Sequence, residues 1–97
     1  MRCADTDPLA VRKKFVQMEL DMTLAMCRAG VPFMAGTDTA AGVHVFPGFS
    51  LHAELRQFVR AGLTPMQALQ TATLNPAKFL GSLTDEGTVE RGKRASI

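Results

Sequence analysis

One carboxylate, Asp38, stands at the end of a short apolar run and is the first candidate for chemistry in this sequence. Residues 30–39 read GVPFMAGTDT, so glycines close the run on both sides before Asp38 is presented. A positioned carboxylate can act as a general base and accept a proton from an attacking water molecule. Asp is also a frequent turn residue, because its side chain hydrogen-bonds to nearby backbone groups. Two interpretations of Asp38 therefore stand: part of an active site, or an ordinary turn residue.

The other side chains that commonly bind metals are few and widely spaced. His44 and His52 lie eight positions apart across a Pro-Gly turn, and no His-x-His pair occurs. Cys3 and Cys27 lack the C-x-x-C spacing of zinc or redox sites. A catalytic zinc ion needs about three protein ligands. We therefore expect no metal site and no bound cofactor in this chain.

A long helix is predicted before the carboxylate, over residues 8–29. Asp7 can cap its free amides, Pro8 suits its first position, and Gly30 provides a stop signal. Apolar residues recur at three- and four-residue intervals and predict one apolar stripe, formed by Val11, Phe15, Met18, Met22 and Ala25. Methionines are adaptable core fillers, and we expect that role for Met18, Met22, Met26, Met34 and Met66.

Residues 31–35 are predicted to form a buried strand. The run VPFMA is too short for a helix and apolar at every position, which is typical of a strand covered on both faces. A loop is predicted over residues 36–49, because it contains glycines and a Pro-Gly turn signal. Elsewhere, residues 88–90 are a possible short strand. The predicted strand therefore has few potential neighbours in this sequence.

Residues 50–81 are predicted to form a helical segment of three helices. Ser50 caps the first helix and Gly62 ends it. Thr64 and Gln67 have the spacing of a capping box at the start of the second. The same kinds of signal predict the last helix, with Asn75 and Pro76 at its start and Gly81 after its end.

The composition is that of one small folded domain over residues 1–97, with a polar, turn-rich tail at 82–97. Hydrophobic residues make up 46% and charged residues 21%, which excludes a disordered chain. The net charge of +2 is spread along the sequence, and Trp and Tyr are absent, so we expect no nucleic-acid partner. The N-terminus does not resemble a signal peptide, and no apolar run reaches ~20 residues, so we expect a cytoplasmic protein without a membrane partner.

Three motifs in order carry a family resemblance. The stretches GVPFMAGTDT, PGFSLHAELRQFVRAGLTPMQALQTATLNPAKFLG and GTVERGKRA resemble the C-terminal portion of the amidohydrolase superfamily, particularly its imidazolonepropionase-like and prolidase-like branch. The resemblance runs from about Val11 onward. It implies a (β/α)₈ barrel enzyme that uses a divalent, zinc-like metal to hydrolyse C–N bonds in cyclic amides or peptides. Residues 31–35 would be the eighth barrel strand. The implied fold class is mainly α with one or two short strands, a partial barrel made of its last β/α units.

The resemblance also implies roles for individual residues. Asp38 lies just past a barrel strand, where active sites of such barrels are found. It would be the metal-adjacent carboxylate that takes a proton from the attacking water. His52 would be at most a substrate-side contact. The family's metal-binding histidines, including its His-x-His pair, have no counterpart in this chain.

Two hypotheses about function follow. In the first, the chain is a truncated piece of an amidohydrolase, and we expect it to be inactive alone. In the alternative, it is a non-catalytic helical module that associates with itself. A barrel strand without neighbours exposes backbone groups on two edges, and its helices expose faces that a barrel would cover. We therefore expect a homodimer or higher homo-oligomer that completes the partial barrel.

Overall fold

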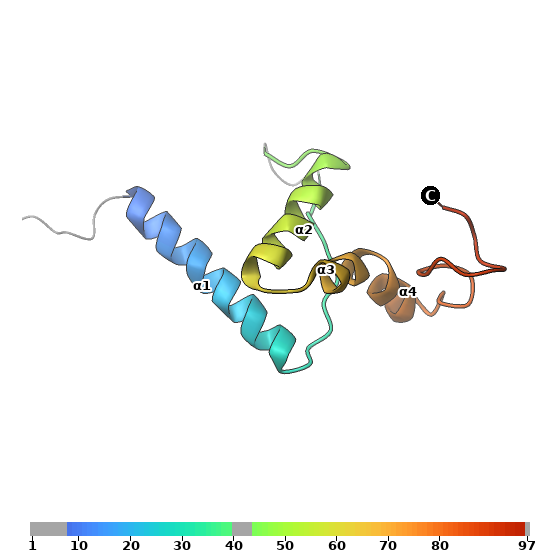
Figure 1. The fold of residues 1–97 in the computed structure, drawn as a ribbon. Helices are drawn as coiled ribbons and strands as arrows, with labels where there is room; N and C mark the ends of the chain where they lie inside the picture. Colours follow the sequence, from blue (N-terminus) through green and yellow to red (C-terminus); the bar gives the residue numbers. More distant parts are fainter. Residues whose placement is uncertain (1–7, 40–43, 97) are drawn as a thin grey trace, which may run out of the picture.

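Four α-helices, joined by turns and one extended segment, make up the part of the chain that the structure describes (Figure 1). The computed structural model describes residues 8–39 and 44–96. The helices are α1 (Pro8–Arg28), α2 (Phe49–Ala61), α3 (Pro65–Ala72) and α4 (Leu74–Leu80). No β-strand forms within the described ranges. The prediction of a mainly helical chain is confirmed, whereas the predicted strands are not formed.

The helices end where glycine permits a left-handed turn. α1 closes with a Schellman motif, in which Val31 N–H donates to the Met26 carbonyl at 3.0 Å. The same six-residue hydrogen bond closes two further helices, from Leu63 to Phe58 after α2 and from Ser82 to Ala77 after α4. The stop signals predicted at Gly30, Gly62 and Gly81 are therefore confirmed.

The helix starts agree with the sequence prediction less uniformly. α2 begins at Phe49 after Gly48, without a side-chain cap. The prediction that Ser50 caps this helix is wrong, because Ser50 already lies in its first turn, where its Oγ accepts a hydrogen bond from Phe46 N–H at 2.7 Å. The predicted cap of α1, Asp7, lies outside the described residues.

The capping box at the start of α3 is confirmed. Gln67 N–H donates to Thr64 Oγ1 at 3.1 Å, and Thr64 N–H donates to Gln67 Oε1 at 2.9 Å. These two bonds satisfy amides that a helix start leaves free.

α3 and α4 are separate helices because of a break at Thr73, where the backbone has φ −129° and ψ −77°. Pro76 explains the break, since it has no N–H to donate and its ring would collide with the carbonyl of Ala72 in a continuous helix. The predicted restart at Asn75 and Pro76 is correct to within one residue, as α4 begins at Leu74.

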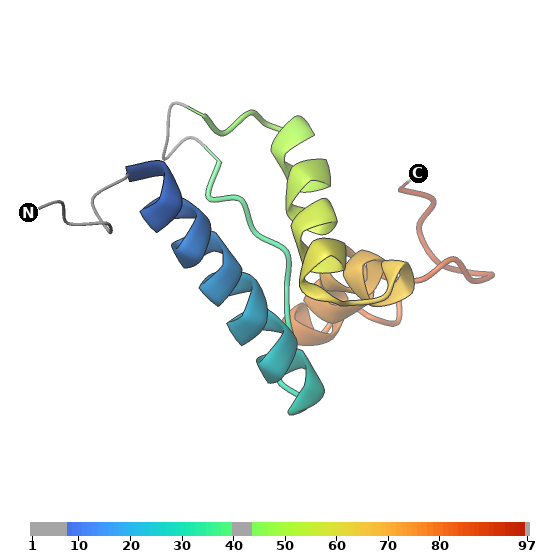
Figure 2. The same cartoon turned by 60° about the vertical axis from the view of Figure 1, so that its left-hand side comes forward.

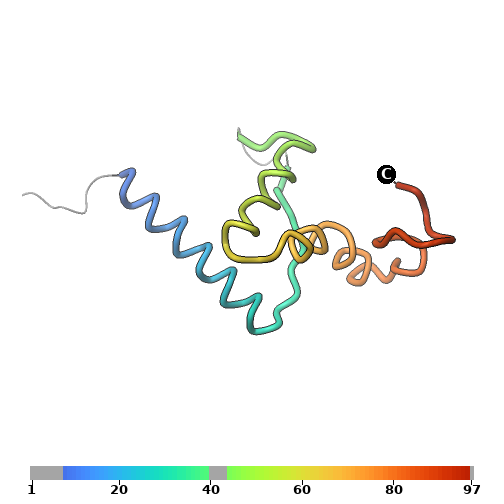
Figure 3. The backbone as a smooth tube through the Cα atoms, in the orientation of Figure 1, coloured from blue at the N-terminus to red at the C-terminus, as the bar shows by residue number. Residues whose placement is uncertain are grey.

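The helices are arranged as an open chain rather than a closed bundle. α1 contacts α2, α2 contacts α3, and α3 contacts α4, with no other helix pair in contact within the described ranges. After α1 the chain turns back and runs as an extended segment, opposite in direction to α2 (Figure 2, Figure 3). The radius of gyration is 17.0 Å, against ~13 Å for a compact domain of this length. The shape is therefore elongated.

The core of this arrangement is small. Its buried apolar side chains are Leu20, Ala61, Leu63, Ala68 and Ala77. Three of them are alanines, so little apolar surface is removed from water in the centre of the molecule. No helix of the described residues combines the length and apolar character needed to cross a membrane.

The face that α1 buries is not the stripe predicted from the sequence. Leu20 is buried, and Leu24 packs against the end of α2 at Gly62. Met18 and Met22 lie on the opposite side of α1, about half a turn away, and Met22 is 55% exposed. The prediction that the methionines fill a core is therefore wrong, because those at 18, 22, 26, 34 and 66 are all exposed.

The predicted strand at residues 31–35 is an extended segment without strand neighbours. A strand requires a ladder of hydrogen bonds to another strand, and the described residues contain no such partner. Residues 88–90 are likewise not a strand.

The tail after α4 forms an ordered turn-rich loop that projects away from α1 (Figure 1). Arg94 N–H donates to the Asp85 carbonyl at 2.8 Å and closes the loop. Inside it, Lys93 Nζ donates to Thr88 Oγ1 at 2.5 Å and lies 3.4 Å from Glu90 Oε2. The tail is therefore held together largely by its own polar contacts.

Candidate functional site

Asp38 follows an extended segment, residues 31–37, that is fixed along one edge by the junction of α3 and α4. The Asn75 side chain donates from Nδ2 to the Phe33 carbonyl at 2.7 Å. Ala35 N–H donates to the Thr71 carbonyl at 2.8 Å. In an extended chain, backbone groups two residues apart point to the same edge. The two bonds therefore form consecutive attachments along a single edge.

An aromatic contact attaches the same segment to α2. The rings of Phe33 and Phe58 lie 6.0 Å apart between centroids at an interplanar angle of 47°. This is within the range of favourable tilted aromatic pairs. The segment is thus held by hydrogen bonds to the α3–α4 junction and by a side-chain contact to α2.

The second edge of the segment makes no backbone hydrogen bond to the part of the chain that the structure describes. Met34 and Gly36 make no backbone hydrogen bond to any described residue. The sequence hypothesis of two exposed edges is therefore corrected: one edge is occupied by Asn75 and Thr71.

Asp38 lies at the far end of this segment in a left-handed conformation, with φ 53°. It is the one non-glycine residue with positive φ in the described ranges. Its side chain is exposed and has no hydrogen bond or ion pair with another described residue. The hydroxyls of its neighbours Thr37 and Thr39 lie 2.6 Å apart and hydrogen-bond to each other. The carboxylate is therefore open to solvent and available as a proton acceptor.

No hydrogen bond or ion pair joins either histidine to Asp38 in the described part of the chain, and the three side chains form no group that could hold a metal ion. His52 is exposed in the first turns of α2, and His44 is exposed in the loop before it. The role of His52 as a substrate-side contact stays a prediction.

Comparison with known proteins identifies the family. The sequence profile of the Amidohydrolase family matches residues 13–97. The chain belongs to the amidohydrolase family. It is also 38% identical over 64 residues to the adenine deaminase of Ligilactobacillus salivarius (strain UCC118), an alignment that covers 66% of this chain and 11% of that protein. The chain thus spans about a tenth of this curated relative. No solved structure matches it.

The family match confirms the amidohydrolase resemblance seen in the sequence. The narrower resemblance, to the imidazolonepropionase-like and prolidase-like branch, stays a prediction, since the match extends to the family as a whole and the relative is an adenine deaminase.

Amidohydrolases generally use a divalent metal, and the residues described in this amidohydrolase chain do not fit one. No group of three or more His, Cys, Asp or Glu side chains within residues 8–39 and 44–96 gathers closely enough to hold a metal ion. A catalytic site of this kind needs about three protein ligands. Among the described residues, the chemistry available at Asp38 is therefore that of its own carboxylate, which can accept and return a proton.

Asn75 and Thr71 are functional candidates of this amidohydrolase chain that the sequence does not predict. The sequence predicts only a helix start at Asn75, and the Thr71 backbone carries no sequence signal. A helix-start Asn usually caps its own helix, but Asn75 lies inside α4, which has no side-chain cap bond. Its side chain was therefore free for a distant partner.

Proposed function

We propose that this chain forms the Asp38-bearing part of an amidohydrolase active site that hydrolyses C–N bonds. One observation carries the proposal: in a chain that belongs to this family, Asp38 is exposed and has no hydrogen-bond or ion-pair partner among the described residues, directly after a segment fixed by two long-range hydrogen bonds. A general base needs both a fixed position and access to its substrate. The coincidence of these properties at one carboxylate supports a catalytic role over that of a simple turn residue.

In the proposed reaction Asp38 accepts a proton from a water molecule. The water oxygen forms a bond to the carbon that carries the substrate nitrogen, and the C–N bond then breaks. The proton held by Asp38 passes to the departing nitrogen, so the carboxylate is regenerated. His52 would contact the substrate from α2. The family's metal-binding histidines have no counterpart in this chain, so the metal ligands would come from other parts of a complete catalytic unit.

Substrate choice follows from the relative. An adenine deaminase is 38% identical over 64 residues, so we propose an aminopurine such as adenine as the first substrate, with cyclic amides as the second class. In the complete catalytic unit, residues 31–35 would become a barrel strand by pairing along the free edge at Met34 and Gly36. The chain alone would be inactive.

The test is ammonia release from adenine and ring opening of cyclic amides, measured with added zinc or manganese. Both the 97-residue chain and the complete product of its gene are assayed. We expect activity only in a complete catalytic unit, and Asp38→Asn should lower its kcat about 100-fold or more. Asp85→Asn is the matched control, because Asp85 is also exposed and lies in the tail. Equal activity of Asp38→Asn and the control would exclude the proposed role.

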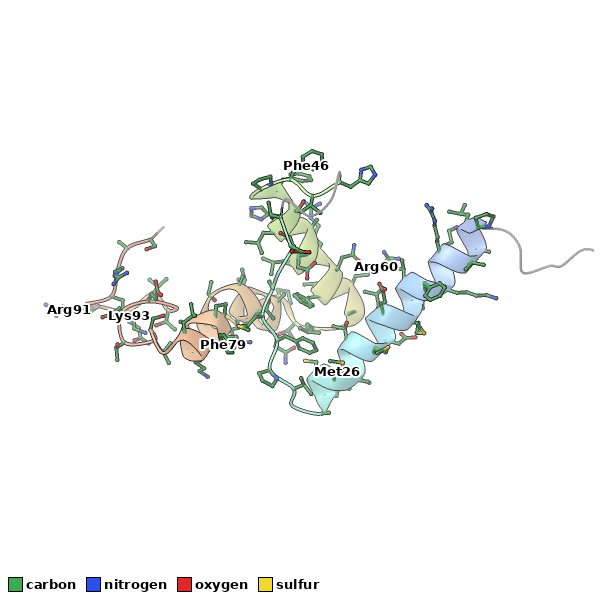
Figure 4. The ribbon with its side chains drawn as sticks, turned by 180° about the vertical axis from the view of Figure 1, so that it is seen from behind. Met26, Phe46, Arg60, Phe79, Arg91 and Lys93 are labelled. Carbon is green, nitrogen blue, oxygen red and sulfur yellow. The ribbon has the colours of Figure 1, made fainter. Side chains whose placement is uncertain are left out.

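A second candidate, self-association of the isolated chain, is favoured by the exposed side of α1. Phe15, Met18 and Met22 form an apolar stripe on the side opposite to Leu20, and Phe15 is 58% exposed. Figure 4 shows Met26 further along the same helix. A helix that is apolar on two sides normally lies between two layers. We propose that a second copy of this chain covers the stripe through a symmetric contact, as isologous interfaces allow.

A further inference from the structure

We propose that Asn75 is a positioning residue for Asp38. Its side chain fixes the extended segment on the α3–α4 junction and thereby sets where the Asp38 carboxylate lies. The catalytic consequence rests on the proposed function. The attachment consists of the hydrogen bonds from Asn75 to Phe33 and from Ala35 to Thr71, which we call the tether. It is a property of the fold and can be tested independently of any activity.

Two long-range hydrogen bonds carry the inference. Beyond the end of α1, the hydrogen bonds from Asn75 to Phe33 and from Ala35 to Thr71 are those that join residues 31–39 to the rest of the described chain. The Asn75 bond spans 42 residues of sequence and is partly buried. A partly buried amide–carbonyl bond at 2.7 Å has good geometry and little competition from water.

The break between α3 and α4 makes both partners available. In a continuous helix the Thr71 carbonyl would accept from the amide of residue 75. The break at Thr73, which Pro76 enforces, leaves that carbonyl without a helical partner. It accepts from Ala35 N–H instead. Thr71 is only 2% exposed, so an unpaired carbonyl there would be costly. The helix break therefore frees the Thr71 carbonyl that accepts one of the two hydrogen bonds of the tether.

The distance from the tether to the carboxylate is short. Asp38 follows Ala35 by three residues, which span ~10 Å when extended. Between Ala35 and Asp38 only Gly36 and Thr37 are left to absorb a displacement of the segment. A misplacement of about 1 Å at a reacting group can lower a rate about 100-fold.

The first experiment tests the two hydrogen bonds of the tether by NMR, through the exchange of their donor protons with solvent. Asn75 is the only asparagine in the sequence, so asparagine-selective ¹⁵N labelling gives a single side-chain amide. We expect one of its two protons to exchange slowly with solvent, and the Ala35 amide to be protected. Asn75→Asp should expose the Ala35 amide and shift the Phe33 carbonyl resonance, because the new carboxylate has no N–H to donate. Gln57→Glu, on the exposed side of α2, is the matched amide-to-carboxylate control.

The second experiment reads the catalytic consequence in the complete gene product. Asn75→Asp should lower kcat about 10- to 100-fold with KM changed less than threefold, while Gln57→Glu leaves both unchanged. A merely structural role would instead lower the amount of folded enzyme without altering its kcat. If Asn75→Asp does not fold, Asn75→Ala removes the donor without adding charge.

The outcomes separate the two proposals. An unprotected Ala35 amide in the wild type, or unchanged protection in Asn75→Asp, overturns the tether whatever the activity shows. A lost tether with unchanged kcat, where Asp38→Asn is inactive, overturns the positioning role and leaves the proposed function standing. A tether that behaves as expected, beside a fully active Asp38→Asn, overturns the proposed function instead.

Discussion

The rings of Phe33 and Phe58 meet at 6.0 Å between centroids and join the extended segment to α2. Phe33 thus serves two attachments at once, since its carbonyl accepts from Asn75 while its ring contacts Phe58. The segment that leads to Asp38 is consequently fixed on two different elements.

A double-mutant cycle should detect the aromatic contact. Phe33→Leu and Phe58→Leu are combined, and we expect a coupling energy of about 0.5–1.5 kcal/mol, because tilted aromatic pairs contribute beyond their buried area. Urea unfolding gives the free energies. Phe79, which is 74% exposed on α4 and is seen in Figure 4, is the control. Phe33→Leu with Phe79→Leu should be additive within about 0.5 kcal/mol. Additivity in both pairs would mean that the contact between the two rings contributes no coupling energy to stability.

The contact of α1 with the end of α2 should make substitution of Gly62 more destabilising than substitution of another glycine with positive φ. A Cβ at Gly62 would lie 2.8 Å from Leu24 Cδ1, and the backbone there has φ 123°. Gly30 also has positive φ, at 84°, but a Cβ there meets nothing within 4 Å. We expect Gly30→Ala to cost about 1 kcal/mol of unfolding free energy and Gly62→Ala about 1–3 kcal/mol more.

Urea titrations of both glycine variants measure this difference. Leu24→Ala in the Gly62→Ala background should recover part of the loss, because it removes the colliding methyl groups. Equal costs at the two glycines would show that Leu24 does not pack tightly against Gly62.

The left-handed backbone at Asp38 should determine the order of stability among variants at this position. Gly and Asn tolerate φ 53°, whereas a β-branched residue does not. We expect Asp38→Gly and Asp38→Asn to be as stable as the wild type or up to about 1 kcal/mol more stable, and Asp38→Val about 1–2 kcal/mol less stable. Chemical denaturation with CD detection gives the order. A Val variant as stable as the Gly variant would contradict the conformation.

The exposed stripe of α1 predicts concentration-dependent association. The 10.5 kDa chain should elute as a dimer or larger species in size exclusion with light scattering. Met18→Lys with Met22→Lys should give the monomer, because burying two unpaired charges is unfavourable. Gln57→Lys adds a charge on α2 and should leave the mass unchanged. A monomeric wild type at concentrations of about 100 µM would end the self-association proposal.

The elements that the sequence predicted well are those set by local chemistry. Gly30 and Gly62 act within one helical turn, and the Thr64–Gln67 capping box spans three residues. Such signals can be interpreted without knowing the fold. The buried face of α1 could not be predicted in this way, because apolar residues lie on two sides of the helix and only packing against α2 selects Leu20 over Met18.

The candidate site shows the same division. Asp38 was accessible to sequence reasoning because it follows a short apolar run closed by glycine. Its tether was not, because the bond from Asn75 to Phe33 crosses 42 residues. Residues 31–35 were predicted to be a strand and are an extended segment instead, because a strand also requires a neighbour and no neighbouring strand exists in the described part of the chain.

Contact between helices that adjoin in sequence has a consequence for cooperativity. A chain stacked in series can unravel from either end while its middle persists, as in repeat proteins. Native-state exchange should therefore give graded opening energies, lowest in the first turns of α1 and highest where Ala61, Ala68 and Thr71 are buried. The ends of such a molecule would fray before its buried middle unfolds, so a melt should show a sloping baseline ahead of one main cooperative transition.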